Sequence, residues 1–530
     1  MMRRFHSYGP VNRNYHFCVE RKALIERCTE QLSGMPEEGG HYFTIWAPRQ
    51  TGKTWLMQEV KKEIAQKYSE QFIIGTMSMQ GVVMKDDEPE ELFFKKINLL
   101  FWETFQIELE TQPETWEDFK RLFSQKSNLF KLPVILFIDE FDSLPPKVID
   151  RLVTLFRDMY LKREIYRLHG IALIGVRAVL GIDSRRGSPF NIQRSLHVPN
   201  FTREEVFDLY QQYQTESEQQ IDIEVVNRLY EVTRGQPGLV CWFGELLTET
   251  YNPDKNKVID IPLWNYVYGR ACRTEWNNTL LNLIAKVRDT YTTQVLELFS
   301  RSDIVFNLRT DWCNYLYLHG IIDAEETVDK NGQINQYCRF ASPFIQQTIY
   351  DALTYDIIGD RLPILTLDPL DRLSDVFDGD ILNIPALLER YKLYLKRLKA
   401  KGLNPWKDQP RRTDLHITEA AGHFHLYAWL QEAIEDHCVI SPEFPTGNGR
   451  VDLHLKCGQR YGIIEVKSFI SLTKTESARY QAAHYALKLG LSSVTLALFT
   501  PVEQEDVLNQ LSSSEEISGI QVVTVAIGWG

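Results

Sequence analysis

A lysine and a hydroxyl residue end a short loop pattern near the start of the chain. Residues 47–54 read APRQTGKT, which is close to the GxxxxGK[ST] pattern of phosphate-binding loops. Backbone N–H groups of such a loop surround phosphate oxygens at a helix start, and the lysine contacts the β and γ phosphates. We therefore expect Lys53 to bind ATP and the Thr54 hydroxyl to bind Mg²⁺. The other loop residues expected at the nucleotide are Pro48, Arg49, Gln50, Thr51 and Gly52.

The loop departs from the pattern at its first position, where Ala47 replaces glycine. Alanine cannot adopt a glycine-only backbone angle without strain. A chance turn containing Gly-Lys-Thr is the alternative interpretation. A second motif favours the phosphate-binding loop, because the apolar run VILFID ends at Asp139 and is followed by Glu140. The carboxyl end of a central parallel strand is where ligands bind in open α/β sheets.

These two acids suit the hydrolysis of a phosphoanhydride. We expect Asp139 to hold the hydration shell of Mg²⁺ and Glu140 to polarise the attacking water. Arg177, which follows the apolar run at 170–176, is a candidate sensor of the γ-phosphate. The alternatives are an acidic pair that caps a helix and an ordinary surface arginine.

A second group of chemically suited residues lies near the carboxyl terminus. Asp452 and the pair Glu465 and Lys467 belong to two strand patterns, GRVDLHL and YGIIEVKS, joined by a turn at Cys457-Gly458. Glu465 and Lys467 project from one strand face because they are two residues apart. Two carboxylates can bind Mg²⁺ while the lysine orients water or stabilises charge on phosphorus. A strand that alternates on a solvated edge is the alternative.

The elements that position these groups alternate through the first 200 residues. Apolar runs that read as buried strands lie at 41–47, 71–79, 132–139 and 170–176, with amphipathic helical patterns between them. This alternation predicts a parallel sheet with helices on both faces. FTREEVFDLYQQYQ and IDIEVVNRLYEVTRG then indicate capped helices of a lid, with Asp222 and Gly235 at the ends of the second. Helix, strand, hairpin, strand and helix patterns that follow suggest a winged helix.

We therefore predict an α/β multidomain protein. Its expected segments are an ATPase core at 1–200, a helical lid at 201–290, a winged helix at 291–355, a linker with a basic helix at 356–412, and a last α/β domain at 413–530. The basic run at 389–412 holds nine Lys or Arg against two acids, with Tyr391, Tyr394 and Trp406 between them. It is either a DNA contact with stacking aromatics or a solvated helix face.

Composition excludes several classes of protein. The charge of 59 − 71 = −12 excludes a chain that is polybasic throughout, and 44% hydrophobic residues exclude wholesale disorder. No apolar stretch is long enough for a membrane span or a signal peptide, so we expect a cytoplasmic protein. The eight cysteines lack a CxxC pair, which favours reduced thiols over disulfides or zinc. His423, His425 and His437 with Cys438 could suggest zinc, but the spacing of His423 and His425 on a helix favours an ordinary helix surface.

The N-terminal motifs resemble those of AAA-like signal-transduction ATPases of the STAND type, including the archaeal-ATPase group. The resemblance covers about residues 12–350 and rests on Pro48-Arg49 in the loop, the Asp139-Glu140 pair, SPFN at 188–191 and GQPG at 235–238. It implies ATP binding and hydrolysis, a winged helix after the lid, and a nucleotide contact from Pro237.

Residues 413–530 resemble the PD-(D/E)xK nuclease superfamily. Asp452, Glu465 and Lys467 match its core signature, and Glu419 matches the acid of its first helix, with Glu432 as a rival. The family's QxxxY helix is matched by Gln481 and Tyr485, which share a helix face. Arg450-Val451 stands where the signature has proline. The resemblance implies Mg²⁺ ligands at Asp452, Glu465 and Glu419, with Lys467 and Gln481 catalytic.

Together these patterns predict an ATP-regulated, Mg²⁺-dependent endonuclease acting on double-stranded DNA as a homo-oligomer. Family resemblance alone adds a role in prokaryotic defence against foreign DNA. Two alternatives stay open. One is a nucleotide switch whose last domain binds DNA or a partner without cutting, and the other is an ATPase loader for a separate nuclease or transposase.

Overall fold

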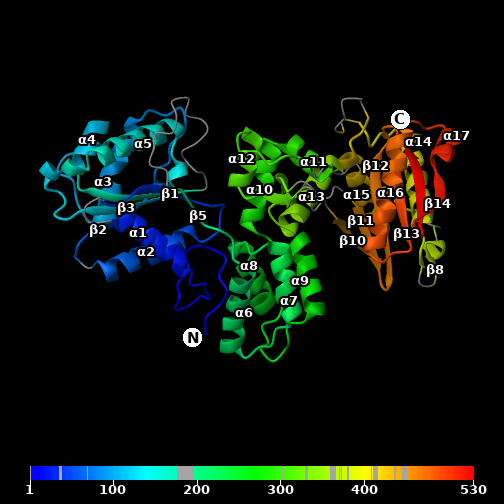
Figure 1. The fold of residues 1–530 in the computed structure, drawn as a ribbon, viewed down its shortest axis with the longest axis horizontal. Coiled ribbons are helices and arrows are strands. Elements are labelled where there is room, and N and C mark those ends of the chain that lie inside the picture. Colours follow the sequence, from blue (N-terminus) through cyan, green and yellow to red (C-terminus); the bar gives the residue numbers. More distant parts are fainter. Residues whose placement is uncertain are drawn as a thin grey trace. The chain divides into compact units, whose positions relative to one another are not determined.

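The computed structural model divides the chain into two compact units (Figure 1). One comprises Met1–Thr279, Arg309–Ile321 and Ala341–Phe344, and the other comprises Leu280–Leu308, Ile322–Phe340 and Ile345–Gly530. The structure describes residues 2–34, 39–68, 70–175, 195–300, 303–328, 332–358, 366–368, 371, 373–378, 381–407, 409, 416–434, 437–443 and 452–529. Arg177 and the SPFN segment lie outside these residues. Within them, no helix has the length and apolar character needed to span a membrane.

The first unit contains the predicted parallel sheet. Its strands are β1 (Tyr42–Trp46), β2 (Ile73–Ser78), β3 (Val134–Asp139), β4 (Leu168–Gly175) and β5 (Ser195–His197). They are ordered β2-β3-β4-β1-β5, and each neighbouring pair is parallel. Strand β4 therefore lies between the strand that leads into the 47–54 loop and the strand that ends at Asp139.

Helices cover both faces of this sheet, as predicted. In Figure 1, α1 (Lys22–Ser33) and α2 (Lys53–Lys67) lie on one side, with α3 (Glu91–Phe105), α4 (Trp116–Leu122) and α5 (Pro146–Leu161) on the other. Ile135 and Phe137 of β3 pack with α1 and α2, whereas Leu136 and Ile138 pack with α3 and α5. Because alternate residues face opposite sides, β3 is apolar at nearly every position.

The helices predicted to form a lid follow in the same unit. They are α6 (Arg203–Ser217), α7 (Ile223–Thr233), α8 (Pro237–Glu245) and α9 (Ile261–Arg273). The Asp222 side chain accepts a hydrogen bond from the N–H of Glu224 at 2.9 Å, so this residue caps α7 as predicted. Arg234 and Gly235 end the helix with positive φ angles of 50° and 70°.

The elements predicted as a winged helix occur in the expected order. They are α11 (Thr292–Ser300), α12 (Asp311–Leu318), β6 (Ile322–Val328), β7 (Ile334–Phe340) and α13 (Pro343–Ile358). Helix α10 (Asn278–Asp289) precedes them, in the range predicted for the lid. Strands β6 and β7 form an antiparallel hairpin. The two compact units divide this segment, with α12 in the first and the hairpin in the second. A winged helix at 291–355 stays a prediction.

The second unit contains a mixed six-stranded sheet. Its strands are β10 (Val439–Glu443), β11 (Asp452–Cys457), β12 (Arg460–Ser468), β13 (Ser493–Thr500), β14 (Ser513–Ile517) and β15 (Ile520–Gly528), in the order β10-β11-β12-β13-β15-β14. Strands β12, β13 and β15 are parallel, and the others pair antiparallel. Four helices accompany the sheet: α14 (Ile384–Ala400), α15 (Glu419–Ile434), α16 (Leu472–Lys488) and α17 (Glu505–Leu511).

Helices pack on both faces of the mixed sheet. Ala482 and Ala483 of α16 pack with Ile463 on one face. On the other face, Phe499 of β13 contacts the rings of Tyr391 and Trp406, and Gly422 of α15 leaves room for it, since a Cβ there would lie 2.8 Å from the Phe499 ring. The face that carries Ile463 also carries Glu465 and Lys467.

The three aromatic residues of the basic run at 389–412 do not form a nucleic-acid surface. Tyr391, Tyr394 and Trp406 are at most 4% exposed, so the alternative in which they stack on bases is wrong. Helix α14 is amphipathic, and Tyr391 and Tyr394 lie on its buried side, whereas Trp406 is buried after the helix ends at Ala400. The small hairpin of β8 (Phe377–Asp378) and β9 (Ile381–Leu382) precedes it.

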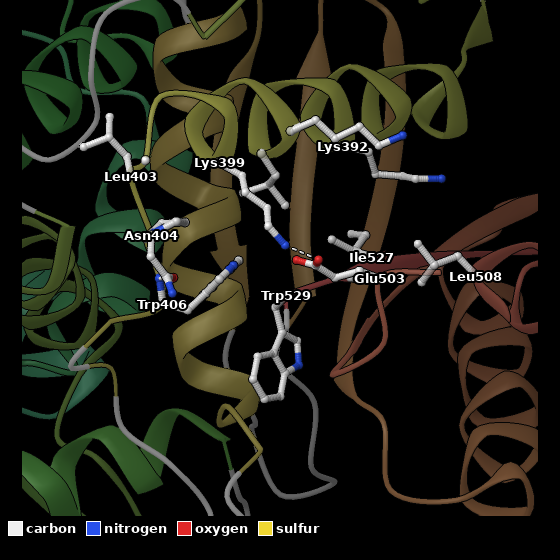
Figure 2. A pocket seen from close by; sticks show the side chains of 14 residues that line it. Lys392, Lys399, Leu403, Asn404, Trp406, Glu503, Leu508, Ile527 and Trp529 are labelled. Atoms are coloured by element: carbon white, nitrogen blue, oxygen red, sulfur yellow. Dashed lines mark hydrogen bonds and ion pairs between the residues drawn. The ribbon is translucent and has the colours of Figure 1, made fainter. Parts of the chain in front are cut away.

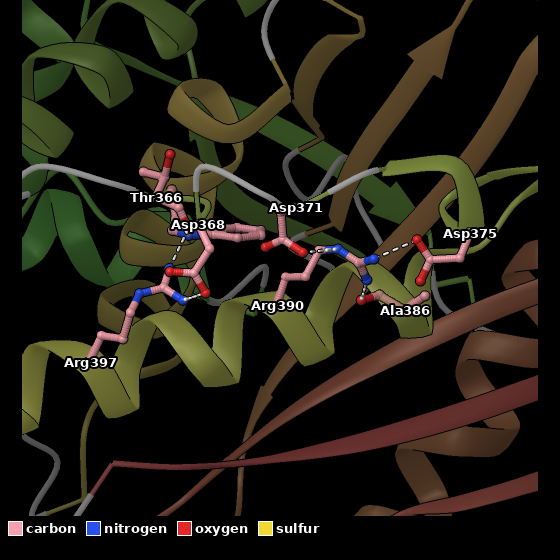
Figure 3. A network of polar contacts seen from close by, with 8 residues as sticks. Thr366, Asp368, Asp371, Asp375, Ala386, Arg390 and Arg397 are labelled. Atoms are coloured by element: carbon pink, nitrogen blue, oxygen red, sulfur yellow. Dashed lines mark hydrogen bonds and ion pairs between the residues drawn. The ribbon is translucent and has the colours of Figure 1, made fainter.

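The cations of α14 are paired with acids of the same unit (Figure 3). Arg390 contacts Asp371 at 3.5 Å and Asp375, and Arg397 contacts Asp368 at 2.9 Å. Lys396 pairs with Glu505 and Lys399 with Glu503. Three acids of the predicted linker, Asp368, Asp371 and Asp375, are therefore held at α14 by ion pairs.

The expectation of reduced thiols was wrong for one cysteine pair. Cys438 and Cys457 form a disulfide whose cysteines are 19 residues apart in sequence. Val439 pairs with Lys456 in the β10–β11 ladder, so the next position brings the two cysteines opposite each other. All eight cysteines lie in the described part of the chain, and the other six form no disulfide there.

The expectation that His423 and His425 lie on a helix surface was also wrong. Both are buried in α15, with 0% and 4% exposure, because helix packing covers nearly its whole circumference. Tyr350 Oη lies 2.5 Å from His423 Nδ1, and Tyr391 Oη lies 2.6 Å from His425 Nδ1. Burial lowers the pKa of His425 to about 3.

His425 should make the stability of this unit depend on pH. The folded pKa lies below the ordinary value of 6.5, so the unfolded chain binds a proton that the folded chain does not. Stability present above pH 6.5 is therefore lost as the pH falls towards 3, at roughly 1 kcal/mol for each pH unit. Urea unfolding of His425→Gln should show a flatter pH dependence than wild type, whereas exposed His484→Gln should not. Equal slopes for wild type and His425→Gln would contradict this.

Candidate functional site

The loop at 47–54 connects β1 to α2 and closes around the side chain of Lys53. Lys53 Nζ donates hydrogen bonds to the carbonyl oxygens of Ala47 and Pro48, both at 2.8 Å. Thr51 Oγ1 donates to the Pro48 carbonyl at 2.9 Å. Gly52 has a φ of 90°, which glycine adopts without strain. Ala47 does not have a positive φ, so its replacement of glycine requires no strained backbone.

The predicted acidic residues lie at this loop. Thr54 Oγ1 donates to Asp139 Oδ2 at 3.3 Å, and the N–H of Glu140 donates to Asp139 Oδ1 at 3.0 Å. Glu140 has a φ of 53° directly after β3, where the chain turns away from the sheet. A hydroxyl and a carboxylate oxygen are hard donors that fit Mg²⁺. Thr54 and Asp139 would thus hold this ion, and the loop would hold the phosphates.

The electrostatics of the loop favour a polyphosphate that carries a metal ion. Burial lowers the pKa of Lys53 to about 8, against the opposing effect of Asp142, Glu140 and Asp139. Burial also raises the pKa of Glu140, and Asp139 and Asp142 raise it further. Three acids face one buried lysine, so a bare anion would be repelled. A divalent cation bound with the phosphates would balance the carboxylates.

Asp142 is a member of this site that the sequence analysis missed. Its carboxylate has the largest stabilising effect on the Lys53 ammonium. Gly175, at the end of β4, leaves room for it, since a Cβ there would lie 2.6 Å from Asp142 Oδ1. The signal was present in IDEFDS, where a third acid follows the strand within three residues.

The lid turn is tied to the loop by two hydrogen bonds. Gln236 Nε2 donates to the Arg49 carbonyl at 3.2 Å, and the N–H of Gly238 donates to the Gln50 carbonyl at 3.0 Å. Pro237 lies between these donors, is buried and begins α8. The turn at 235–238 therefore lies at the loop, and a nucleotide contact from Pro237 stays a prediction.

Gly238→Ala should weaken ATP binding without unfolding the domain. Its Cβ would lie 2.5 Å from Gln50 Oε1 and 2.7 Å from Gln50 Cβ, so Gln50 must shift. Overpacking costs roughly 1–3 kcal/mol, and we expect a loss of about tenfold in ATP affinity measured by calorimetry. Gly269→Ala in α9 is the control, because its Cβ would meet nothing within 4 Å. Equal ATP affinity in the two variants would contradict the coupling of lid and loop.

Four of the predicted nuclease residues lie close together in the second unit. The β11–β12 ladder places Asp452 directly opposite Glu465. Lys467 Nζ lies 3.4 Å from Glu419 Oε2 and 3.6 Å from Glu465 Oε1. Glu465 is completely buried, and the Lys467 and Glu419 side chains are 17% and 21% exposed. Glu419 is the first residue of α15, where the helix dipole favours a carboxylate.

Two finer expectations concern the acid of the first helix and the QxxxY helix. The structure brings Glu419 to Lys467, whereas Glu432 is exposed further along α15. Gln481 is exposed on α16 and forms no hydrogen bond or ion pair with the described residues. The Tyr485 ring lies 6.5 Å from that of His454, a buried residue two positions after Asp452 that also contacts the Tyr461 hydroxyl. The sequence analysis missed His454, although its spacing from Asp452 places both on one strand face.

Burying the charges of Glu419, Glu465 and Lys467 costs free energy that a bound ligand could offset. Removing the Glu465 carboxylate from water is unfavourable, and Lys467 supplies a neighbouring cation. Among residues whose side chains are described, no three His, Cys, Asp or Glu gather closely enough to hold a metal ion. The Asp452 side chain is not among them. Glu419 and Glu465 supply oxygen donors of the kind Mg²⁺ prefers.

Comparison with known proteins assigns the N-terminal region of the first unit. Residues 6–255 match a family model described as an AAA-like domain, so this region is an AAA-like P-loop ATPase domain. The match ends before the mixed sheet, and no curated protein matches the sequence.

Several solved structures are distantly similar. The Walker-type ATPase of Pyrococcus abyssi is 15% identical with a TM-score of 0.44, covering 65% of this chain and 99% of that one. The Aeropyrum pernix ORC1 protein in complex with DNA is 14% identical with a TM-score of 0.33, covering 65% and 95%. The Thermotoga maritima RuvB Holliday junction branch migration motor is 12% identical with a TM-score of 0.32, covering 60% and 92%.

Proposed function

We propose that this protein is a DNA endonuclease that requires Mg²⁺ and is regulated by ATP. The AAA-like domain binds and hydrolyses ATP, and the mixed-sheet unit cuts DNA. The observation that carries the proposal is the position of Lys467 between Glu419 and Glu465, with Asp452 opposite Glu465 in the ladder. The resemblance to PD-(D/E)xK nucleases supports the same residues.

Each residue has a role that follows from its chemistry. Asp452, Glu465 and Glu419 would hold Mg²⁺ through carboxylate oxygens, and the ion supplies a Lewis acid for phosphodiester hydrolysis. Lys467 can only donate hydrogen bonds, so it orients water or stabilises negative charge on the phosphate oxygens. Burial of Glu465 keeps water from competing with these contacts.

ATP would act through the loop at 47–54 and the lid turn. Because Arg49 and Gln50 accept hydrogen bonds from the turn, a nucleotide that rearranges the loop changes the lid as well. Nucleotide binding thus has a direct mechanical route to the lid helices, which is the form a regulatory ATPase needs.

Double-stranded DNA as substrate favours a homo-oligomer. One site cuts one strand, and the two antiparallel strands are related by a twofold axis, which a symmetric pair of subunits matches. A role in prokaryotic defence against foreign DNA rests on the STAND-type resemblance alone.

A nucleotide switch that binds DNA or a partner without cutting is the second candidate, and an ATPase loader for a separate nuclease or transposase is a variant of it. One observation favours it: Lys467 contacts both Glu419 and Glu465, as in a purely structural buried ion pair. In that case the cluster stabilises the fold and binds no metal.

Plasmid cleavage separates the two candidates. Purified protein is incubated with supercoiled plasmid and Mg²⁺, with ATP, with ADP or without nucleotide, and nicked and linear products are measured. A nuclease produces them only with the metal, at a rate that depends on the nucleotide. Plasmid that stays intact under all three conditions, with Mn²⁺ as well, would favour the switch or the loader.

A further inference from the structure

The second unit contains a pocket of about 360 Å³ that the proposed function does not use (Figure 2). One wall is α14, which contributes Lys392, Lys396 and Lys399. The end of β15, with Trp529, and the segment before α17 form the other side. Leucine and isoleucine side chains provide an apolar floor, and in Figure 2 the Lys399–Glu503 pair lies near both Trp406 and Trp529.

The pocket lies at the same sheet edge as the cluster around Lys467. Strands β12, β13 and β15 are parallel, so their carboxyl ends meet at one edge. The N–H of Trp529 donates to the Thr500 carbonyl at 3.0 Å at the end of β13. His416 links the two places, since its ring lies 6.0 Å from that of Trp529 and its Nδ1 lies 3.1 Å from the Phe469 carbonyl. Glu419 follows three residues later.

The lysines suit a phosphate. They are spaced i, i+4 and i+7 and therefore share one face of α14. The side chains of Lys396 and Lys399 are 60% and 63% exposed, and they pair with Glu505 and Glu503. An exposed ion pair contributes at most about 1 kcal/mol, so a phosphate can replace these carboxylates at small cost. A phosphate also offers more oxygen acceptors and more charge than one carboxylate.

The rest of the pocket suits a planar apolar group. Trp406 and Trp529 both line the pocket, and Trp529 is half-buried, whereas Trp406 is almost fully packed. Nucleobases stack on such rings in proteins that bind single strands. An aromatic surface next to paired lysines matches a base joined to a phosphate.

We propose that this pocket binds one nucleotide unit, with its base on Trp529 and its phosphate at Lys396 and Lys399. The proposal builds on the proposed function, since a nucleotide of the DNA strand being cut would lie at the edge that carries Lys467. A free nucleotide acting as an effector has the same chemistry, and the test separates the two sources.

Binding is measured by anisotropy and calorimetry with EDTA present, using thymidine monophosphate and a short oligothymidylate as probes. The double variant Lys396→Gln/Lys399→Gln should weaken oligothymidylate binding by about tenfold. The slope of the logarithm of the binding constant against the logarithm of the salt concentration should fall in magnitude by roughly one to two. Glu503→Gln/Glu505→Gln should strengthen it, because the competing carboxylates are gone. Trp529→Ala should lower the affinity for oligothymidylate by about tenfold, and Trp529→Phe should keep most of the wild-type affinity. Lys488→Gln on α16 is the control for a lost surface charge.

The outcomes are distinct. Pocket-dependent binding of the oligothymidylate alone identifies a strand subsite, and comparable binding of the monophosphate identifies an effector site. The proposal is overturned if the double lysine variant behaves like Lys488→Gln with both probes. The plasmid assay is scored separately. Binding that depends on the pocket, without any cleavage, would contradict the proposed nuclease activity and support the nucleotide site. Cleavage without such binding would support the nuclease activity and contradict the nucleotide site.

Discussion

Glu465→Gln is expected to lower plasmid cleavage by about two to four orders of magnitude while ATP hydrolysis stays near wild type. The amide keeps the shape of the side chain but loses the charge that would bind Mg²⁺. The ATP site lies in the other compact unit, so its residues are unchanged. Cleavage and ATP turnover are measured on the same preparation, and Mg²⁺ affinity is measured by calorimetry.

Substitution of an acid and substitution of the lysine in this cluster should have different effects on Mg²⁺ affinity. Glu419→Gln should lose Mg²⁺ affinity together with cleavage, and Glu432→Gln is its matched control, because Glu432 is an exposed acid of the same helix. Lys467→Ala removes the cation 3.6 Å from Glu465, so Mg²⁺ should still bind while cleavage is lost. If Glu465→Gln cuts plasmid at the wild-type rate, the mixed sheet is not the nuclease.

The positions of the 47–54 loop and of Glu465 and Lys467 were predictable because they depend on the spacing of neighbouring residues. The 47–54 loop was placed between a strand and a helix, and β1 and α2 confirm this. Glu465 and Lys467 share a face because strand residues alternate, and the short turn at Cys457-Gly458 makes β11 and β12 antiparallel neighbours. In both cases a few consecutive residues carry the information.

Burial in α14 and α15 was not predictable from residue types alone. Tyr391 and Tyr394 are compatible with an outward stacking surface or an inward core, and only the packed sheet decides. A pattern was nevertheless available, because Tyr391, Leu395 and Leu398 recur at i, i+4 and i+7 and form the buried side of an amphipathic helix. His423 and His425 point to different sides of α15, yet packing on most of this helix buries both.

The remaining misses depend on tertiary contacts. The Cys438–Cys457 disulfide requires the β10–β11 register, and β10 carries too few residues for a clear strand pattern. Strand β5 has three residues, of which only Leu196 is buried. The hydrogen bonds from the lid turn to Arg49 and Gln50 join residues nearly 190 positions apart. No local pattern reports such contacts.

Lys53→Ala is expected to abolish ATP binding, with a loss of at least about a hundredfold in affinity. Its ammonium is the cation that would face the β and γ phosphates, and no other lysine lies in the 47–54 loop. Because burial lowers the pKa of Lys53 to about 8, wild-type affinity for ATP should also fall as the pH rises above 8, where the loop must take up a proton to bind. Lys62→Ala, an exposed lysine of the same helix, should leave both properties unchanged.

Glu140→Gln is expected to separate binding from hydrolysis. The carboxylate directly after β3 would polarise the attacking water and does not hold the phosphates, so ATP affinity should stay near wild type while turnover falls by about two to four orders of magnitude. ATP should still raise the melting temperature of Glu140→Gln, because a ligand that binds only the folded state stabilises it, and it should not raise that of Lys53→Ala. A melting shift of wild-type size in Lys53→Ala would remove the assignment of the loop. Normal turnover in Glu140→Gln would instead move the role of orienting water to Asp142, the third acid of the site.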